Sequence, residues 1–258
     1  MAPRRGPGKT DGCAHRPDPV HGAVRADVDV VLLDAGNTLA GMDMALLADV
    51  ATAEGVAVTP DALARAEAAA RPAVSRAVAA GASGEARTTF VVYVEAMLAA
   101  LGRPPADCRA VAPRLAAAVK RVPTTRLWAR VLPGVPAALG RLRAAGLGLV
   151  VVSNSDGTCE ETLVRLGLRD AVDAVVDSMR VGFEKPDPRI FAAALATCGA
   201  TPARGVHVGD LYDVDVIGAR RAGLRAVLLD PHDDWAGVDC PRAADLAAFV
   251  DGLVGRGA

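Results

Sequence analysis

The sequence predicts an α/β fold in which a doubly wound, Rossmann-like parallel sheet carries an inserted all-helical cap domain. Three observations predict it. A β-branched apolar run ends at Asp34, an alanine-rich stretch with helical spacing covers about 42–123, and helical segments then alternate with short apolar runs up to about residue 229. With 52% apolar and 23% charged residues among its 258, the chain can bury a large core.

The elements are expected in the following order. Residues 1–27 are rich in Pro, Gly, Arg and His, and we expect a disordered tail there. The run 28–33 predicts a strand buried on both faces. Helical periodicity predicts a cap over 42–123, with breaks at Gly81, Gly84 and Pro104. Core helices are expected at 134–145, 159–166, 187–198 and 214–222, and core strands at 147–152, 174–176, 205–208 and 224–229.

The alternating strands and helices after the cap favour a parallel sheet with right-handed crossovers. The Rossmann-like core is therefore expected over 28–41 and 124–258. Thr158 and Glu161 have the spacing of a capping box at the start of one core helix.

Charge and composition exclude several classes of function. The 29 basic and 30 acidic side chains give a net charge of −1, so we expect no nucleic-acid partner. No apolar run is long enough to span a membrane, and the N-terminal segment lacks the apolar stretch of a secretory signal. The five cysteines are far apart and form no CxxC pair, which is typical of reduced thiols. We therefore expect a cytoplasmic protein.

Polar clusters follow the predicted strands at the edge where α/β folds bind ligands. The clusters are DAGNT at 34–38, Ser153 with Asn154, the Lys185 loop, and Gly209-Asp210 with Asp213 and Asp215 beyond it. Carboxylates from two strands can hold Mg²⁺, which prefers oxygen ligands. A hydroxyl and a lysine can bind phosphoryl oxygens, and a further carboxylate can attack phosphorus. These residue types favour phosphoryl transfer to or from a small phosphorylated molecule.

Four motifs, in order, resemble those of the haloacid dehalogenase-like hydrolase superfamily, in the branch with a helical cap after the first strand. They are LLDAGNTL at 32–39, VVVSN at 150–154, EKPDPRIF at 184–191 and VHVGDLYDVD at 206–215. The resemblance covers about residues 28–240. It implies a Mg²⁺-dependent phosphatase that works through an aspartyl-phosphate.

The resemblance also implies a role for each matching residue. Asp34 would be the nucleophile, assisted by Lys185, while Thr38, Ser153 and Asn154 would bind the phosphate. The metal ligands would be Asp34, the backbone carbonyl of Gly36, Asp210 and Asp215. Asp215, which lies five residues after Asp210, would support either the metal or Lys185. Asp213 is the other candidate for that role.

Gly36 departs from the family pattern. Phosphatases of the family usually carry an aspartate there as general acid and base, a step worth about 10²- to 10⁴-fold in rate. Glycine cannot transfer a proton through a side chain, although its carbonyl can still bind a metal. The alternatives are a phosphatase for good leaving groups or with a substitute acid from the cap, a 2-haloacid dehalogenase-like hydrolase, and a catalytically lapsed phosphometabolite-binding protein. Asp210 favours phosphate, because true dehalogenases of the family usually lack that acid.

Overall fold

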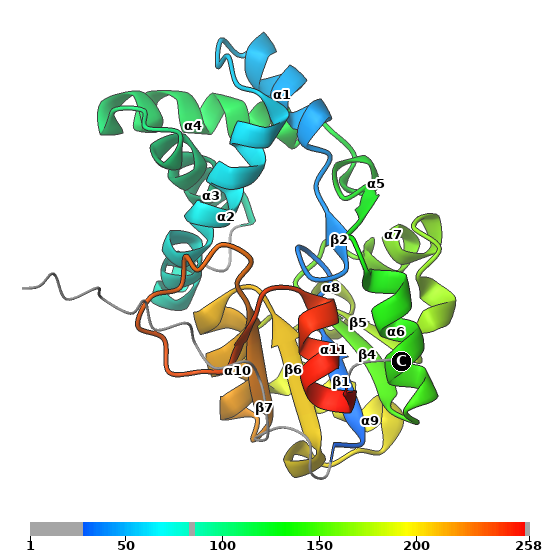
Figure 1. The fold of residues 1–258 in the computed structure, drawn as a ribbon. Coiled ribbons are helices and arrows are strands. Elements are labelled where there is room, and N and C mark those ends of the chain that lie inside the picture. The colour runs from blue at the N-terminus through cyan, green and yellow to red at the C-terminus, as the bar shows by residue number, and fades with distance from the viewer. Residues whose placement is uncertain (1–27, 83–85, 256–258) are drawn as a thin grey trace, which may run out of the picture.

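The computed structural model describes residues 28–82 and 86–255, and these form a three-layer α/β/α core with a group of helices above one sheet edge (Figure 1). The six-stranded sheet has the order β5-β4-β1-β6-β7-β8, and every neighbouring pair is parallel. Its strands are β1 (Val30–Leu33), β4 (Gly148–Ser153), β5 (Ala174–Asp177), β6 (Gly205–Gly209), β7 (Arg225–Leu229) and β8 (Arg242–Ala243). The expected parallel α/β fold is confirmed.

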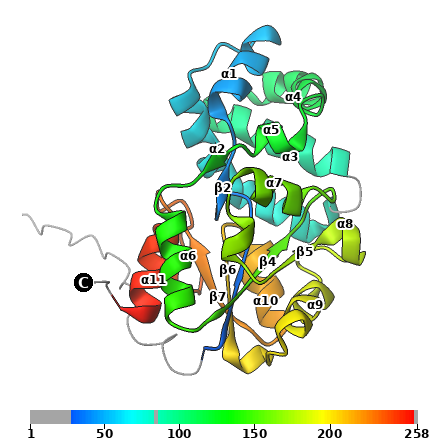
Figure 2. The same ribbon diagram turned by 90° about the vertical axis from the view of Figure 1, so that its right-hand side faces the viewer.

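Strand β1 lies in the middle of the sheet and is buried on both faces. Val31 and Leu33 pack on one face with α6 (Val135–Ala144), α7 (Cys159–Arg165) and α11 (Leu246–Val254). Val30 and Leu32 pack on the other face with α9 (Pro188–Cys198) and α10 (Ile217–Arg221). Figure 2 shows the two helical layers on opposite sides of the sheet. This burial explains why the strand reads as an unbroken apolar run.

The helical group lies above the carboxyl edge of the sheet (Figure 1). It consists of α1 (Met44–Ala53), α2 (Pro60–Ala77), the π-helical turn η1 (Val78–Ala82), α3 (Ala86–Ala100) and α4 (Pro105–Val119). Asp43 caps α1 by accepting hydrogen bonds from the amides of Ala45 and Leu46, and Thr59 caps α2, which begins with Pro60. These helices bury a core of their own, separate from the sheet.

The chain leaves the core at β2 (Ala40–Gly41) and returns through α5 (Thr124–Leu127) and β3 (Arg130–Val131). Strands β2 and β3 pair antiparallel, so the outgoing and returning connections lie side by side. This small two-stranded ribbon connects the helical group to the carboxyl edge of the sheet, where Asp34 lies.

Several local expectations differ from the structure. Thr158 is the first residue before α7, but it makes no side-chain cap, because its hydroxyl bonds to Asp156 and the Cys159 amide bonds to Asp177 instead. Helix α2 continues into η1 across Gly81, and the expected break at Gly84 lies outside the described residues, as does the tail at 1–27. Pro104 does mark the start of α4.

The expected helix at 214–222 is divided into the π-helical turn η4 (Tyr212–Val216) and α10. Short elements that have too few residues for a clear period were not expected. They are β2, β3, β8, α5, α8 (Ser178–Val181), and the 3-10 turns η2 (Arg169–Ala171) and η3 (Pro202–Arg204). The nine-residue helix α11 was not expected either. Within the described part of the chain, no helix has the length and apolar character needed to cross a bilayer.

Candidate active site

Three of the expected site residues lie at the carboxyl ends of adjacent strands. Asp34 follows β1, Asp210 follows β6, and Ser153 ends β4. Strands β4 and β6 both flank β1, and the Asp34 amide donates to the Val208 carbonyl at 2.9 Å. The fold therefore brings Asp34 to one edge together with two residues that lie more than 100 positions further along the chain.

Lys185 is the centre of the site. Its Nζ lies 2.5 Å from Oδ1 of Asp34 and 2.7 Å from Oδ1 of Asp215, and the residue is only 2% exposed. Burial alone would lower the pKa of this lysine, but the charges of Asp215 and Asp34 raise it above its usual range. A permanently charged ammonium group thus fixes the position of the Asp34 carboxylate.

Asp215 supports this lysine rather than projecting freely into the site. Its Oδ1 also contacts Nε2 of the buried His207 at 3.0 Å, and its Oδ2 accepts the Leu211 amide at 2.9 Å. Burial opposes ionisation, but Lys185 and His207 together hold the pKa of Asp215 below its usual range. A Cβ at Gly209 would lie 2.3 Å from the Asp215 Cγ, so only glycine lets this carboxylate lie against the end of β6.

Asp213, the competing acid, has a different neighbour. Its carboxylate accepts a hydrogen bond from the hydroxyl of Ser75 on α2 at 2.8 Å, and its amide donates to the same hydroxyl at 2.7 Å. It therefore joins the helical group to the core, while Asp215 contacts Lys185.

Asn154 holds the backbone of Lys185. Its Oδ1 accepts the Lys185 amide at 2.7 Å, and its Nδ2 donates to the Lys185 carbonyl at 2.8 Å. Both ends of the side-chain amide have protein partners, and the phosphate-binding role expected for this residue stays a prediction. The geometry is that of a positioning residue.

Thr38 and Ser153, the other two residues expected to bind phosphate, are both buried at this edge. The Thr38 hydroxyl has no hydrogen-bond partner within the described chain, although buried polar atoms are normally paired. An oxygen of a bound ligand would satisfy it.

Asp210 is 4% exposed and lies among charged side chains. Burial raises its pKa to about 8, and the nearby Asp34 and Asp215 carboxylates add to the shift, while Arg71 opposes it. Its Oδ2 accepts Nδ2 of Asn37 at 3.1 Å and lies 3.4 Å from Nε of Arg71, a residue of α2.

Gly36 lies beneath the indole of Trp128. A Cβ at this position would be 2.9 Å from Cη2 of Trp128 and 3.2 Å from Cζ3. The volume that a larger side chain at position 36 would need is therefore filled by an aromatic ring from the returning connection.

The residues present fit a Mg²⁺ ion of the kind the sequence predicts. Within the described residues no three side chains of Asp, Glu, His or Cys form a metal cluster. Mg²⁺, however, often takes only one or two carboxylates and keeps several waters. Asp34 and Asp210 are buried carboxylates whose pKa values are both raised, first by burial, and a cation would offset their mutual repulsion.

Sequence reasoning missed the contribution of the helical group to the site. Glu67 and Arg71 are 2% and 7% exposed and reach the core edge from α2. Their i,i+4 spacing in an alanine-rich helix was the available signal. The sequence did not show that this pair faces Asp210 instead of solvent.

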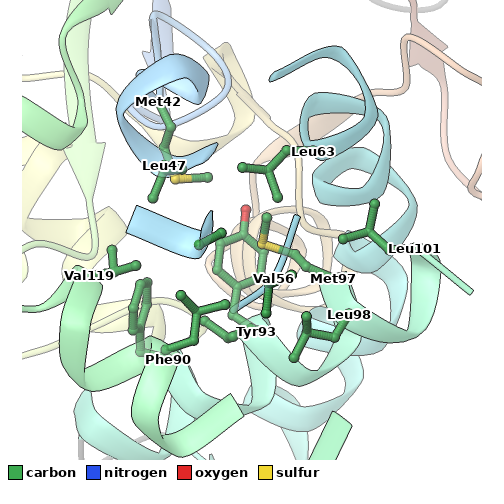
Figure 3. Close-up of a pocket in the computed structure, with 13 residues that line it drawn as sticks. Met42, Leu47, Val56, Leu63, Phe90, Tyr93, Met97, Leu98, Leu101 and Val119 are labelled. Atoms are coloured by element: carbon green, nitrogen blue, oxygen red, sulfur yellow. The ribbon is translucent and has the colours of Figure 1, made fainter. Parts of the chain in front are cut away.

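An apolar cavity of about 30 Å³ lies inside the helical group (Figure 3). Apart from the Tyr93 hydroxyl its lining is entirely apolar, and it has room for about one water molecule. It borders the charged residues described above, because the hydroxyl of the lining residue Tyr93 donates to Glu67.

Comparison with known proteins agrees with this architecture. Residues 28–223 match the family model described as hydrolase, haloacid dehalogenase-like hydrolase. Haloacid dehalogenase-like hydrolase domain-containing protein 3 of Bos taurus is 42% identical over 123 residues, 48% of this chain and 49% of the relative. Glyceraldehyde 3-phosphate phosphatase of Methanothermobacter thermautotrophicus is 41% identical over 102 residues, 39% and 45% of the two chains. The chain thus spans about half the length of the curated relatives it matches.

Among solved structures, the HAD-hydrolase YfnB from Bacillus subtilis, bound to magnesium, superposes with a TM-score of 0.64. The match covers 86% of this chain and 96% of that one at 18% identity. It shows a shared fold.

Proposed function

This chain belongs to the haloacid dehalogenase-like hydrolases, and from that premise we propose that it is a Mg²⁺-dependent phosphatase acting through an aspartyl-phosphate on Asp34. The observation that carries the proposal is the buried Lys185 ammonium, bonded to both Asp34 and Asp215. It orients one Asp34 oxygen and leaves the other, Oδ2, for attack. The same ammonium offsets negative charge that develops on a transferring phosphoryl group.

The proposed reaction has two steps. The free Asp34 oxygen attacks phosphorus, the bond between phosphorus and the leaving oxygen breaks, and the leaving group takes a proton from solvent. Water then hydrolyses the acyl phosphate, which releases inorganic phosphate and restores the Asp34 carboxylate. Asp215, His207 and Asn154 are positioning residues for Lys185 in both steps.

The cation would be held by the carboxylates of Asp34 and Asp210 and the carbonyl of Gly36. When bound, it supplies positive charge to the phosphoryl oxygens. Thr38 and Ser153 are proposed to donate hydroxyl hydrogen bonds to the same group. The unpaired Thr38 hydroxyl supports this assignment. Asp215, whose oxygens are already bonded to Lys185, His207 and Leu211, is proposed to support the lysine.

We infer a small phosphorylated metabolite as substrate. The charge balance offers no attraction for a nucleic acid, and a similar protein is named glyceraldehyde 3-phosphate phosphatase. Four cysteines, at positions 108, 159, 198 and 240, are free thiols, which supports a cytoplasmic location.

A second candidate is hydrolysis of a 2-haloacid, in which an ester rather than a phosphate forms on Asp34. Gly36 favours it, because a halide leaves without a proton and needs no acid at that position. The lapsed, phosphometabolite-binding form is the third candidate, since Gly36 carries no proton-transferring side chain.

Phosphate release from generic phosphate esters, with and without Mg²⁺, tests the proposal. We expect Mg²⁺-dependent release that Asp34→Asn abolishes and that Asp61→Asn, an exposed acid on α2, leaves unchanged. Metal-independent halide release from a 2-haloacid would establish the second candidate. Binding of phosphate esters without turnover in the wild type would establish the third.

A further inference from the structure

Helix α2 places a buried arginine against Asp210. The Arg71 guanidinium forms two hydrogen bonds with the carboxylate of Glu67, at 3.0 and 2.6 Å, and its Nε is 3.4 Å from Oδ2 of Asp210. One guanidinium therefore contacts a carboxylate of its own helix and a carboxylate of the sheet edge. It supplies positive charge to the carboxylate of Asp210, one of the residues proposed to hold the cation.

Several contacts hold this arginine in place. Asn37, which follows β1, donates through Nδ2 to both Glu67, at 3.0 Å, and Asp210, at 3.1 Å. The Tyr93 hydroxyl, which projects from the apolar interior of the helical group (Figure 3), donates to Glu67. Arg71 is thus part of a connected, buried network, unlike an exposed arginine with many rotamers.

A second contact keeps α2 on the core one turn further along. Ser75 bonds to Asp213, and Val74 packs with Val214 of η4. In this arrangement Lys185 and Asp210 are both nearly inaccessible to solvent.

We propose that Arg71 competes with the divalent cation for Asp210 and so sets the metal affinity of the site. The inference rests on the cation position given under the proposed function. A divalent cation held by the Asp210 carboxylate would lie near the guanidinium, and like charges repel strongly where burial excludes water. Binding of the cation to Asp210 would therefore require the guanidinium to give up its contact with Oδ2.

The test measures metal affinity, independent of turnover. Mn²⁺ prefers the same kind of oxygen ligands as Mg²⁺, and the concentration of free Mn²⁺ can be measured by electron paramagnetic resonance. We compare the wild type with the double variant Glu67→Gln, Arg71→Met, which keeps the net charge unchanged by removing both members of the Glu67–Arg71 pair and frees the Asp210 carboxylate from its guanidinium contact. The double variant should bind Mn²⁺ about tenfold more tightly or better, since it lacks the positive charge that lies 3.4 Å from Oδ2 of Asp210. Damage to the site would weaken binding, so a gain is specific to the proposal.

Two control variants complete the experiment. Ser75→Ala removes the contact between α2 and Asp213 without changing the net charge. It should leave the Mn²⁺ affinity within about twofold of the wild type. Asp210→Asn should abolish the high-affinity binding in both backgrounds. Equal or weaker binding in the double variant overturns the role of Arg71. A tenfold gain in Ser75→Ala also overturns it, since that gain would come from loosening α2. Binding that survives Asp210→Asn overturns the proposed cation position itself.

Discussion

The contact between Gly36 and Trp128 makes a quantitative prediction about restoring an acid at position 36. In Gly36→Asp the new Cβ would lie 2.9 Å from Cη2 of Trp128, whereas carbon atoms in ordinary contact are about 3.5–4.0 Å apart. The ring must therefore move by roughly half an ångström or more. Overpacking of this kind costs about 1–3 kcal/mol, and a chain of this size should lose about 2–4 °C in Tm per kcal/mol.

A double-mutant cycle separates this clash from the added charge. Gly36→Ala introduces the same Cβ without a carboxylate, and Trp128→Ala removes the ring. The unfolding free energy of all combinations is measured in urea. We expect Gly36→Ala to destabilise the wild type by about 1–3 kcal/mol and the Trp128→Ala background by at least about 1 kcal/mol less. Equal costs in the two backgrounds would refute the reasoning.

The same cycle predicts activity. With the ring present, Gly36→Asp should not improve turnover, because the new carboxyl group has no room to adopt a productive position. In the Trp128→Ala background, Gly36→Asp should hydrolyse alkyl phosphates about 10²- to 10⁴-fold faster than Gly36→Ala does, which is the usual range for general acid catalysis. Phosphate release is the measurement.

Three further predictions follow from the site. Lys185→Met removes the ammonium group from two buried carboxylates, Asp34 and Asp215, and should lower the unfolding free energy in urea by about 3–5 kcal/mol. Lys120→Met, an exposed control, should change it by less than about 0.5 kcal/mol. Equal stability of the two variants would contradict the buried bridge. Asn154→Ala removes two hydrogen bonds to the Lys185 backbone, so in steady-state phosphatase assays it should lower kcat more than it raises KM, and an unchanged kcat would exclude a positioning role. Burial raises the pKa of Cys159 to about 12, so at pH 8 only about one Cys159 thiol in 10⁴ is a thiolate. Peptide mass spectrometry should therefore show iodoacetamide labelling of the exposed Cys198 long before labelling of Cys159. Equal labelling of the two cysteines would contradict the burial of Cys159.

The sequence was sufficient for the fold class and for the edge where the site lies. Apolar runs such as 28–33 and 147–152 are strong signals because both faces of a central parallel strand are buried. Polar residues directly after these runs, such as Asp34 and Asp210, then lie at one edge by topology alone. Neither inference needs the direction of any side chain.

Only the tertiary structure decided which side chains meet. The contact between Lys185 and Asp34 joins residues 151 positions apart, and the choice between Asp213 and Asp215 depends on which way each carboxylate points from one π-helical turn. The approach of Arg71 to Asp210 likewise depends on how α2 packs over the sheet. Local sequence patterns reflect burial and secondary structure, whereas these contacts arise from long-range packing, which no periodicity along the chain encodes.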